Sequence, residues 1–106
     1  MSAPIASVAI RAIGKDGERF DISLQIGAPY QRSELLGEWS CPVSLEPLYP
    51  QLRDQTGSDA FQALCLAIRL AFTLLTHFKA GGGKLLCSDG TEFPIDAYLP
   101  SPKSGA

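Results

Sequence analysis

Residues 59–79 read DAFQALCLAIRLAFTLLTHFK, and this long helical pattern decides the fold. Either Ser58 or Asp59 suits the helix N-cap, and Gln62 follows at the spacing of a capping box. Lys79 suits the negative end of the helix dipole, and a run of three glycines begins two residues later. The stretch therefore predicts one long helix that begins near Asp59 and ends near Lys79.

The predicted helix has a polar face and a wide apolar surface. At about 100° per residue, its polar side chains fall within an arc of roughly 100°. These are Gln62, Arg69, Thr73, Thr76 and His77. Small side chains form a stripe on the apolar surface: Ala60, Ala63, Ala67 and Ala71. Bulky side chains form a second stripe beside it: Phe61, Leu64, Ile68, Phe72 and Leu75. We expect the alanine stripe to face a sheet and the bulky stripe to need separate cover.

Two segments upstream predict an antiparallel hairpin. Residues 20–26, FDISLQI, alternate strictly between apolar and polar side chains, as a strand with one buried face does. Residues 7–13, SVAIRAI, are rich in β-branched side chains and partly alternate. The glycines of residues 14–17 suit the tight turn that would join these two strands.

A third strand is predicted over residues 39–45, whose apolar side chains point to one side. They are Trp39, Cys41, Val43 and Leu45. Pro42 cannot donate a ladder hydrogen bond, so this strand lies at an edge or is bulged there. We expect its four apolar side chains to share one buried sheet face with those of residues 20–26. The intervening residues 30–37 are interpreted as an exposed loop.

The order of elements predicts the fold class. Residues 84–87 read as a short strand after the glycines, and residues 92–95 as a further edge segment after a turn. The order is β-β-β-α-β, with one more strand if residues 92–95 pair. We therefore predict an α+β fold in which an antiparallel β-meander packs on one long α-helix. We expect residues 1–100 to form a single domain and residues 101–106, rich in Pro, Ser and Gly, to form a flexible tail.

Composition excludes some classes of partner. The chain has 9 basic and 11 acidic residues, a balance unlike that of a general nucleic-acid binder. The apolar run of residues 60–78 approaches membrane-spanning length but carries Arg69 near its middle, so we interpret it as a core helix. No basic residue precedes the first mildly apolar stretch, as it would in a signal peptide. We expect a cytoplasmic protein without nucleic-acid or membrane partners.

Candidate catalytic residues are few. His77, the only histidine, lies in the last helical turn, and Cys87 would have to reach it through the fold. The three cysteines have neither metal-ligand nor redox-motif spacing, so we expect no disulfide. Cys41 and Cys65 are expected to be unreactive and Cys87 accessible. The glycines before Lys84 follow a helix rather than a strand, which favours a helix stop over a phosphate loop. We assign no catalytic residue, cofactor or metal.

Two motifs carry a family resemblance. The W-x-C-P element starts at Trp39 and the D-x-x-Q-A-L helix start at Asp59, in that order, between an alternating hairpin and a glycine stop. In this arrangement residues 8–95 resemble a family of uncharacterised bacterial proteins of similar length. The resemblance implies a small bacterial cytoplasmic α+β protein and supplies no catalytic residues.

Two classes of function fit these observations. The first is a non-catalytic protein-binding domain, in its sharpest form an immunity protein that neutralises a bacterial toxin, or otherwise a homodimeric adaptor. The alternative is a small enzyme or ligand-binding protein that uses Cys87 or His77. The bulky stripe is the candidate dimer surface, which leaves the exposed loop as the candidate partner-binding site. The residues expected to bind a partner there are Tyr30, Arg32, Glu34 and Glu38.

Overall fold

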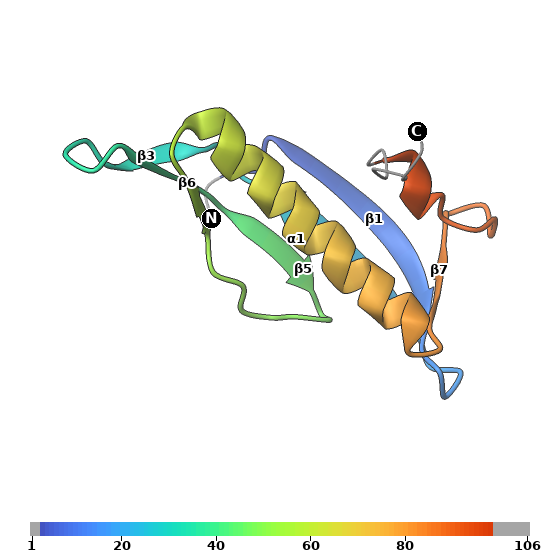
Figure 1. Ribbon diagram of the computed structural model, residues 1–106. Coiled ribbons are helices and arrows are strands. Elements are labelled where there is room, and N and C mark those ends of the chain that lie inside the picture. The colour runs from blue at the N-terminus through green and yellow to red at the C-terminus, as the bar shows by residue number, and fades with distance from the viewer. Residues whose placement is uncertain (1–2, 99–106) are drawn as a thin grey trace, which may run out of the picture.

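Strands and one long helix make up residues 3–98, the part of the chain that the computed structural model describes (Figure 1). The expected flexible tail, residues 101–106, lies outside the described residues. The elements are β1 (Ala6–Ile13), β2 (Arg19–Ile26), β3 (Tyr30–Ser33), β4 (Glu38–Cys41), β5 (Val43–Glu46), β6 (Gln55–Gly57), α1 (Ala60–Ala80), β7 (Lys84–Leu86) and the 3-10 helix η1 (Ile95–Ala97).

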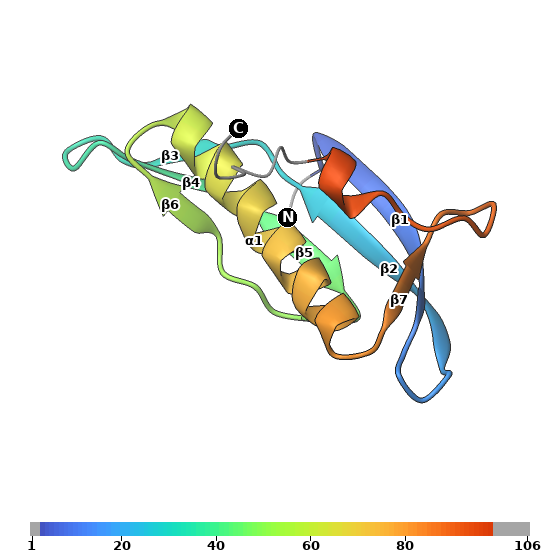
Figure 2. The ribbon, with the colours of Figure 1, turned by 45° about the vertical axis from the view of Figure 1, so that its right-hand side comes forward.

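The strands form two antiparallel sheets. Sheet A has the order β5-β2-β1-β7, and sheet B has the order β3-β4-β6. α1 crosses both sheets, and η1 lies beside it over the β1 side of sheet A (Figures 1 and 2). The predicted α+β class, with antiparallel strands packed on one long helix, is confirmed. The division into two sheets was not predicted.

The predicted β1–β2 hairpin is present. Its register pairs Ile10 with Ile22, so both isoleucines face the same side of sheet A and are buried. The Gly14 N–H donates to the carbonyl of Glu18 at 2.7 Å, and Gly17 has a φ of 85°, which favours glycine. The alternation of β2 therefore predicted its buried face correctly.

The predicted third strand is wrong in one respect, because Pro42 divides it between the two sheets. β5 pairs with β2 on one side of Pro42, and β4 pairs with β3 on the other. Pro42 lacks an N–H but its carbonyl accepts a 2.9 Å hydrogen bond from the Gly27 N–H. The two halves are thus a single long ribbon, β2–β3 against β4–β5, that bends at Gly27 and Pro42.

Three other expectations need correction. Residues 30–37 are not a loop, since Tyr30–Ser33 forms β3 before a turn; its YQRS sequence lacks apolar alternation because neither face enters the core. The expected set of strands lacked residues 55–57, which form β6. Residues 92–95 contribute a single bridge, Leu86 to Glu92, and then turn into η1.

The N-terminus of α1 confirms the predicted capping. The Asp59 side chain caps the helix by accepting from the Gln62 N–H at 2.7 Å, and Gln62 Oε1 accepts from the Ser58 N–H at 2.6 Å. The first turn lies so close to β6 that a Cβ at Gly57 would stand 2.8 Å from the Ala63 nitrogen. Glycine at position 57 therefore lets the helix begin directly on sheet B.

The glycines after α1 close the helix. Gly82 has a φ of 106°, and its N–H donates to the Lys79 carbonyl at 3.0 Å. The Gly83 N–H donates to the Phe78 carbonyl at 3.0 Å, which completes a Schellman motif. The predicted helix stop is confirmed, and the chain reverses into β7.

The core lies between the alanine stripe of α1 and both sheets. Ala63, Ala67 and Ala71 are fully buried, because small side chains let the helix approach the strands closely. The eight apolar side chains expected on one face all enter or border this single core, although Trp39 and Cys41 reach it from sheet B. α1 is long and apolar enough to cross a membrane, but its buried alanine stripe favours a core helix.

The bulky stripe is covered largely by the chain itself. Leu75 is fully buried and Phe72 is 8% exposed, with the Phe72 ring stacked on that of Tyr98 at a centroid separation of 5.4 Å. Leu64 and Ile68 are half-buried, and Phe61 is exposed. The five residues are therefore not one continuous exposed surface. A two-fold interface that uses Phe72 and Leu75, as expected for a dimer, would require their present cover to move.

Replacing Ala67 by leucine should destabilise the fold. The larger side chain would overpack the fully buried contact between α1 and the sheets, at a cost of about 1–3 kcal/mol. Denaturant unfolding measures this change in the free energy of unfolding. Ala80→Leu, at an exposed position of the same helix, is the matched control and should leave stability nearly unchanged. Equal stability of the two variants would contradict the close packing.

Candidate functional site

A hairpin arm, residues 30–41, projects from the body beside the N-terminus of α1 (Figure 1). It consists of β3, the turn at residues 34–37 and β4. β6 pairs with β4 from Cys41, opposite Gln55, to Trp39, opposite Gly57, so Glu38 and the turn lie beyond β6. The radius of gyration is 15.0 Å, larger than the roughly 13 Å of a compact domain of this size. β3 and the turn accordingly extend the molecule, while Trp39 and Cys41 of β4 still join the core.

Two adjacent leucines stand at the tip of the arm. Leu35 is 94% exposed and Leu36 is 71% exposed. Gly37, with a φ of 67°, closes the turn by donating its N–H to the Glu34 carbonyl at 3.3 Å. The Leu36 N–H donates to Ser33 Oγ at 3.2 Å. Local hydrogen bonds thus hold the tip in one shape while it presents apolar side chains to solvent.

The four residues expected to bind a partner all lie in this arm. Arg32 is exposed where the β3–β4 register shifts, and Glu34 is exposed in the turn. Glu38, at the start of β4, is half-buried, and Tyr30 is 43% exposed at the base of β3. The two tip leucines were missed. Their signal was a pair of adjacent leucines in an otherwise polar segment.

A polar row braces the base of the arm. Tyr30, Ser40 and Thr56 lie opposite one another on neighbouring strands of sheet B. The Tyr30 hydroxyl donates to Asp54 Oδ2 at 2.6 Å, and the Ser40 and Thr56 hydroxyl oxygens lie 3.0 Å apart in a hydrogen bond. Ser40 is fully buried, so the Thr56 hydroxyl satisfies a group that would otherwise be costly. The row joins three strands on the face of sheet B away from α1.

Asp54 changes the acidity of Tyr30. The hydrogen bond to Asp54, partial burial and the Asp54 charge together raise the pKa of the Tyr30 phenol. A hydrogen bond to Ser40 and the charge of Arg32 act in the opposite direction. The net direction is upward, which favours the neutral phenol that can donate to the carboxylate.

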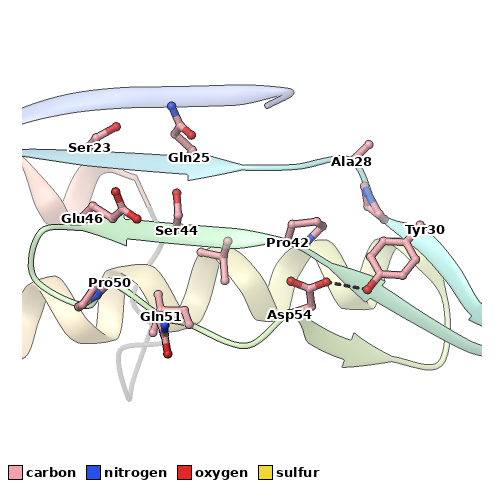
Figure 3. A pocket seen from close by; sticks show the side chains of 13 residues that line it. Ser23, Gln25, Ala28, Tyr30, Pro42, Ser44, Glu46, Pro50, Gln51 and Asp54 are labelled. Carbon is pink, nitrogen blue, oxygen red and sulfur yellow. Dashed lines mark hydrogen bonds between the residues drawn. The ribbon is translucent and has the colours of Figure 1, made fainter. Parts of the chain in front are cut away.

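A polar groove begins beside this row (Figure 3). It has a volume of about 980 Å³ and crosses the side of sheet A that faces away from α1. Side chains of β2 and β5 form its floor, the loop of residues 50–54 forms one wall, and Tyr30 and Pro42 lie at one end. The groove and the arm therefore share Tyr30.

The cysteines differ from expectation at one position. Cys41 is fully buried, and burial together with the charge of Asp54 raises the pKa of its thiol, which donates to the Gly27 carbonyl at 3.3 Å. Cys65, expected to be unreactive, is exposed because it lies on the solvent side of α1. Cys87 is half-buried. All three are free thiols.

The structure does not assemble a catalytic pair from the residues considered. His77 is exposed in the last turn of α1, within a shallow hollow that it shares with Phe72 and Asp96. The Cys87 thiol lies instead 3.9 Å from the Glu92 carbonyl oxygen. Among residues 3–98, no group of three His, Cys, Asp or Glu side chains is placed to hold a metal ion.

Comparison with protein-family models, with curated proteins and with solved structures finds no match for this chain. The resemblance of residues 8–95 to a small bacterial family consequently stays an expectation. Function has to be argued from the arm and the groove.

Asp54→Asn should lower the pKa of Tyr30. The substitution removes the negative charge and weakens the hydrogen bond that favour the neutral phenol, so tyrosinate forms at a lower pH than in the wild type. A pH titration of tyrosinate absorbance measures the shift, and Tyr30→Phe identifies which of the three tyrosines contributes it. An unchanged titration in the Asn variant would contradict the hydrogen bond.

The same shift affects alkaline stability. Because the folded pKa of Tyr30 lies above the unfolded one, its contribution is complete below the unfolded pKa, near 10, and is lost as pH rises through the folded pKa. Tyr30→Phe should therefore lose less stability than the wild type over this alkaline range. Denaturant unfolding at successive pH values compares the two.

Thiol labelling of the folded protein should proceed in the order of exposure. Cys65 should react first, Cys87 more slowly, and Cys41 only on the timescale of unfolding. Mass spectrometry of the labelled protein measures the order. Cys65→Ser is the control and should remove the fast phase alone. Fast modification of Cys41 would show that the junction between the sheets opens readily.

Proposed function

We propose that this chain is a non-catalytic protein-binding domain and that the tip of its hairpin arm enters a partner. The observation that carries the proposal is the pair Leu35 and Leu36, 94% and 71% exposed on a turn of defined shape. Exposed leucine side chains are stabilised only when another surface covers them and removes them from water. In the described residues no other segment lies over the tip, so the cover is assigned to a partner.

The energetics of such a contact are favourable. Fully burying one leucine side chain contributes about 1.5–3 kcal/mol. The hydrogen bonds at Ser33 and Gly37 hold the turn before binding, which reduces the conformational entropy lost in the complex. Arg32 and Glu34 flank the leucines and would form a charged rim that selects the partner.

The narrower form of the proposal is an immunity protein that neutralises a bacterial toxin. Small size, a net charge of −2 and an arm able to enter a cleft support this form. An arm that carries apolar side chains away from a rigid body can block another protein's active site without any chemistry of its own. The catalytic alternative through Cys87 and His77 is less well supported, because no hydrogen bond joins the two side chains in the described structure.

The Leu35→Ser/Leu36→Ser variant tests the role of the tip. The wild-type chain, immobilised, should retain a partner from a lysate of the organism that encodes it, and the purified partner should bind at a defined stoichiometry. Losing two buried leucines removes at least about 3 kcal/mol, so the Kd should rise at least 100-fold. Calorimetry with the purified partner measures this.

Ile5→Ser is the matched control, since Ile5 is 55% exposed outside the arm. It should leave the Kd unchanged, and both variants should unfold at nearly the wild-type temperature because they alter exposed side chains. If the purified partner binds the double serine variant as tightly as wild type, the tip is not the binding site. For the immunity form, co-expression of wild type, but not of the double variant, should restore growth of cells that express the partner.

A further inference from the structure

The groove lies on the face of sheet A that is turned away from α1. Its floor is made of the side chains of β2 and β5 that alternate with the core residues, among them Ser23, Gln25 and Ser44. They lie on the strand face opposite the core residues, where Ser23 is exposed and Gln25 and Ser44 are half-buried. The groove is therefore a partly exposed sheet face with a side wall, the loop of residues 50–54.

The charged side chains that line the groove all carry the same sign of charge. Among its lining residues only Glu46 and Asp54 are charged, and both are acidic. The remaining polar groups are hydroxyls and amides, which can accept hydrogen bonds from a cation. Tyr30 occupies Asp54 Oδ2, which leaves Oδ1 of that carboxylate to accept from a ligand. Arg32 lies near enough to influence Tyr30 but does not line the groove.

The two carboxylates lie at opposite ends of β5. Asp54 is beside Pro42, which precedes the strand, and Glu46 is its last residue (Figure 3). Four residues of strand span roughly 13 Å, at about 3.3 Å per residue. In an extended peptide, side chains at positions i and i+4 are separated by the same distance and point to the same side. Basic side chains four residues apart on such a peptide could therefore reach the Pro42 end and the Glu46 end of β5 together.

We propose that this groove binds an extended protein segment whose basic side chains, four residues apart, reach Glu46 and Asp54. Ser23, Gln25 and Ser44 of the floor hydrogen-bond to the segment between those two contacts. Arginine suits both ends: its guanidinium can donate two parallel hydrogen bonds to the Glu46 carboxylate and a single one to Asp54 Oδ1, since Oδ2 accepts from Tyr30. The polar, open lining is unlike that of pockets for small apolar ligands, which are mostly enclosed by hydrophobic side chains.

A defined peptide tests the inference without knowledge of the natural partner. The probe is a fluorescent nonapeptide of glycine, serine and threonine with arginines at its third and seventh positions. Anisotropy measurements at low ionic strength should show saturable binding to the wild-type chain. Glu46→Gln should weaken binding about tenfold, as the loss of one charge-assisted contact does. Asp54→Asn should weaken it similarly.

Two controls make the outcome specific. Asp16→Asn makes the same change of charge in the β1–β2 turn, outside the groove, and should bind the peptide as the wild type does. A peptide of equal composition with its arginines adjacent should bind more weakly, because it cannot reach both ends. Glu46 is exposed, so Glu46→Gln should keep the wild-type unfolding temperature even if Asp54→Asn does not.

Several results would overturn the inference. These are an absence of saturable binding, equal weakening by Asp16→Asn, and equal affinity for the adjacent-arginine peptide. A wild-type dimer that Glu46→Gln dissociates in sedimentation velocity would also overturn it, since the occupant would then be a second copy. The Leu35→Ser/Leu36→Ser variant should bind the peptide normally. If the peptide does not bind, the proposed function of the arm is therefore unaffected. If the double serine variant binds the partner normally, the proposal for the groove is likewise unaffected.

Discussion

A single hydrogen bond, from the Gly27 N–H to the Pro42 carbonyl, marks the point on which the architecture depends. The long ribbon of β2–β3 against β4–β5 bends there, since proline offers no N–H to continue the ladder. Cys41 fills the inside of the bend and donates to the Gly27 carbonyl. Beyond the bend the far half of the ribbon becomes the arm, whose Trp39 and Cys41 still contact the core. Its near half provides the floor of the groove.

α1 keeps the two halves of the bent ribbon in a fixed relation. Its alanine stripe contacts both sheets, and Gly57 lets its first turn rest directly on β6. The helix therefore holds sheet B as well as sheet A, although the sheets share no strand pairing. On the opposite side, the bond between Tyr30 and Asp54 ties the arm to the loop that walls the groove. The arm is consequently braced on both faces at its base.

The parts of the fold that were predictable are those in which burial leaves a period in the sequence. The strict alternation of β2 and the capping and glycine signals of α1 led to correct elements. β3 and β6 were missed because their short sequences show no apolar alternation. Their pairing rests on backbone hydrogen bonds and on the polar side-chain contacts of Tyr30 and Thr56. Cys65 was misassigned for a related reason. Its position on the helix wheel lies between apolar and polar arcs, and only the packed structure decides which side it joins.

The candidate site likewise has a part that the sequence predicts and a part that only the folded structure shows. The charged side chains of residues 30–38 indicated exposure, yet the sequence could not indicate that Tyr30 turns back toward Asp54 while Leu35 and Leu36 turn outward. Pairing of β3 and β6 on either side of β4 brings residue 54 to residue 30. It also places the groove at the base of the arm. A partner that engaged both surfaces would make its second contact within one complex, so two weak contacts would combine into a strong one. The rigid base of the arm favours this higher overall affinity. A freely moving arm would lose more conformational entropy when both contacts form, and the affinity would be lower.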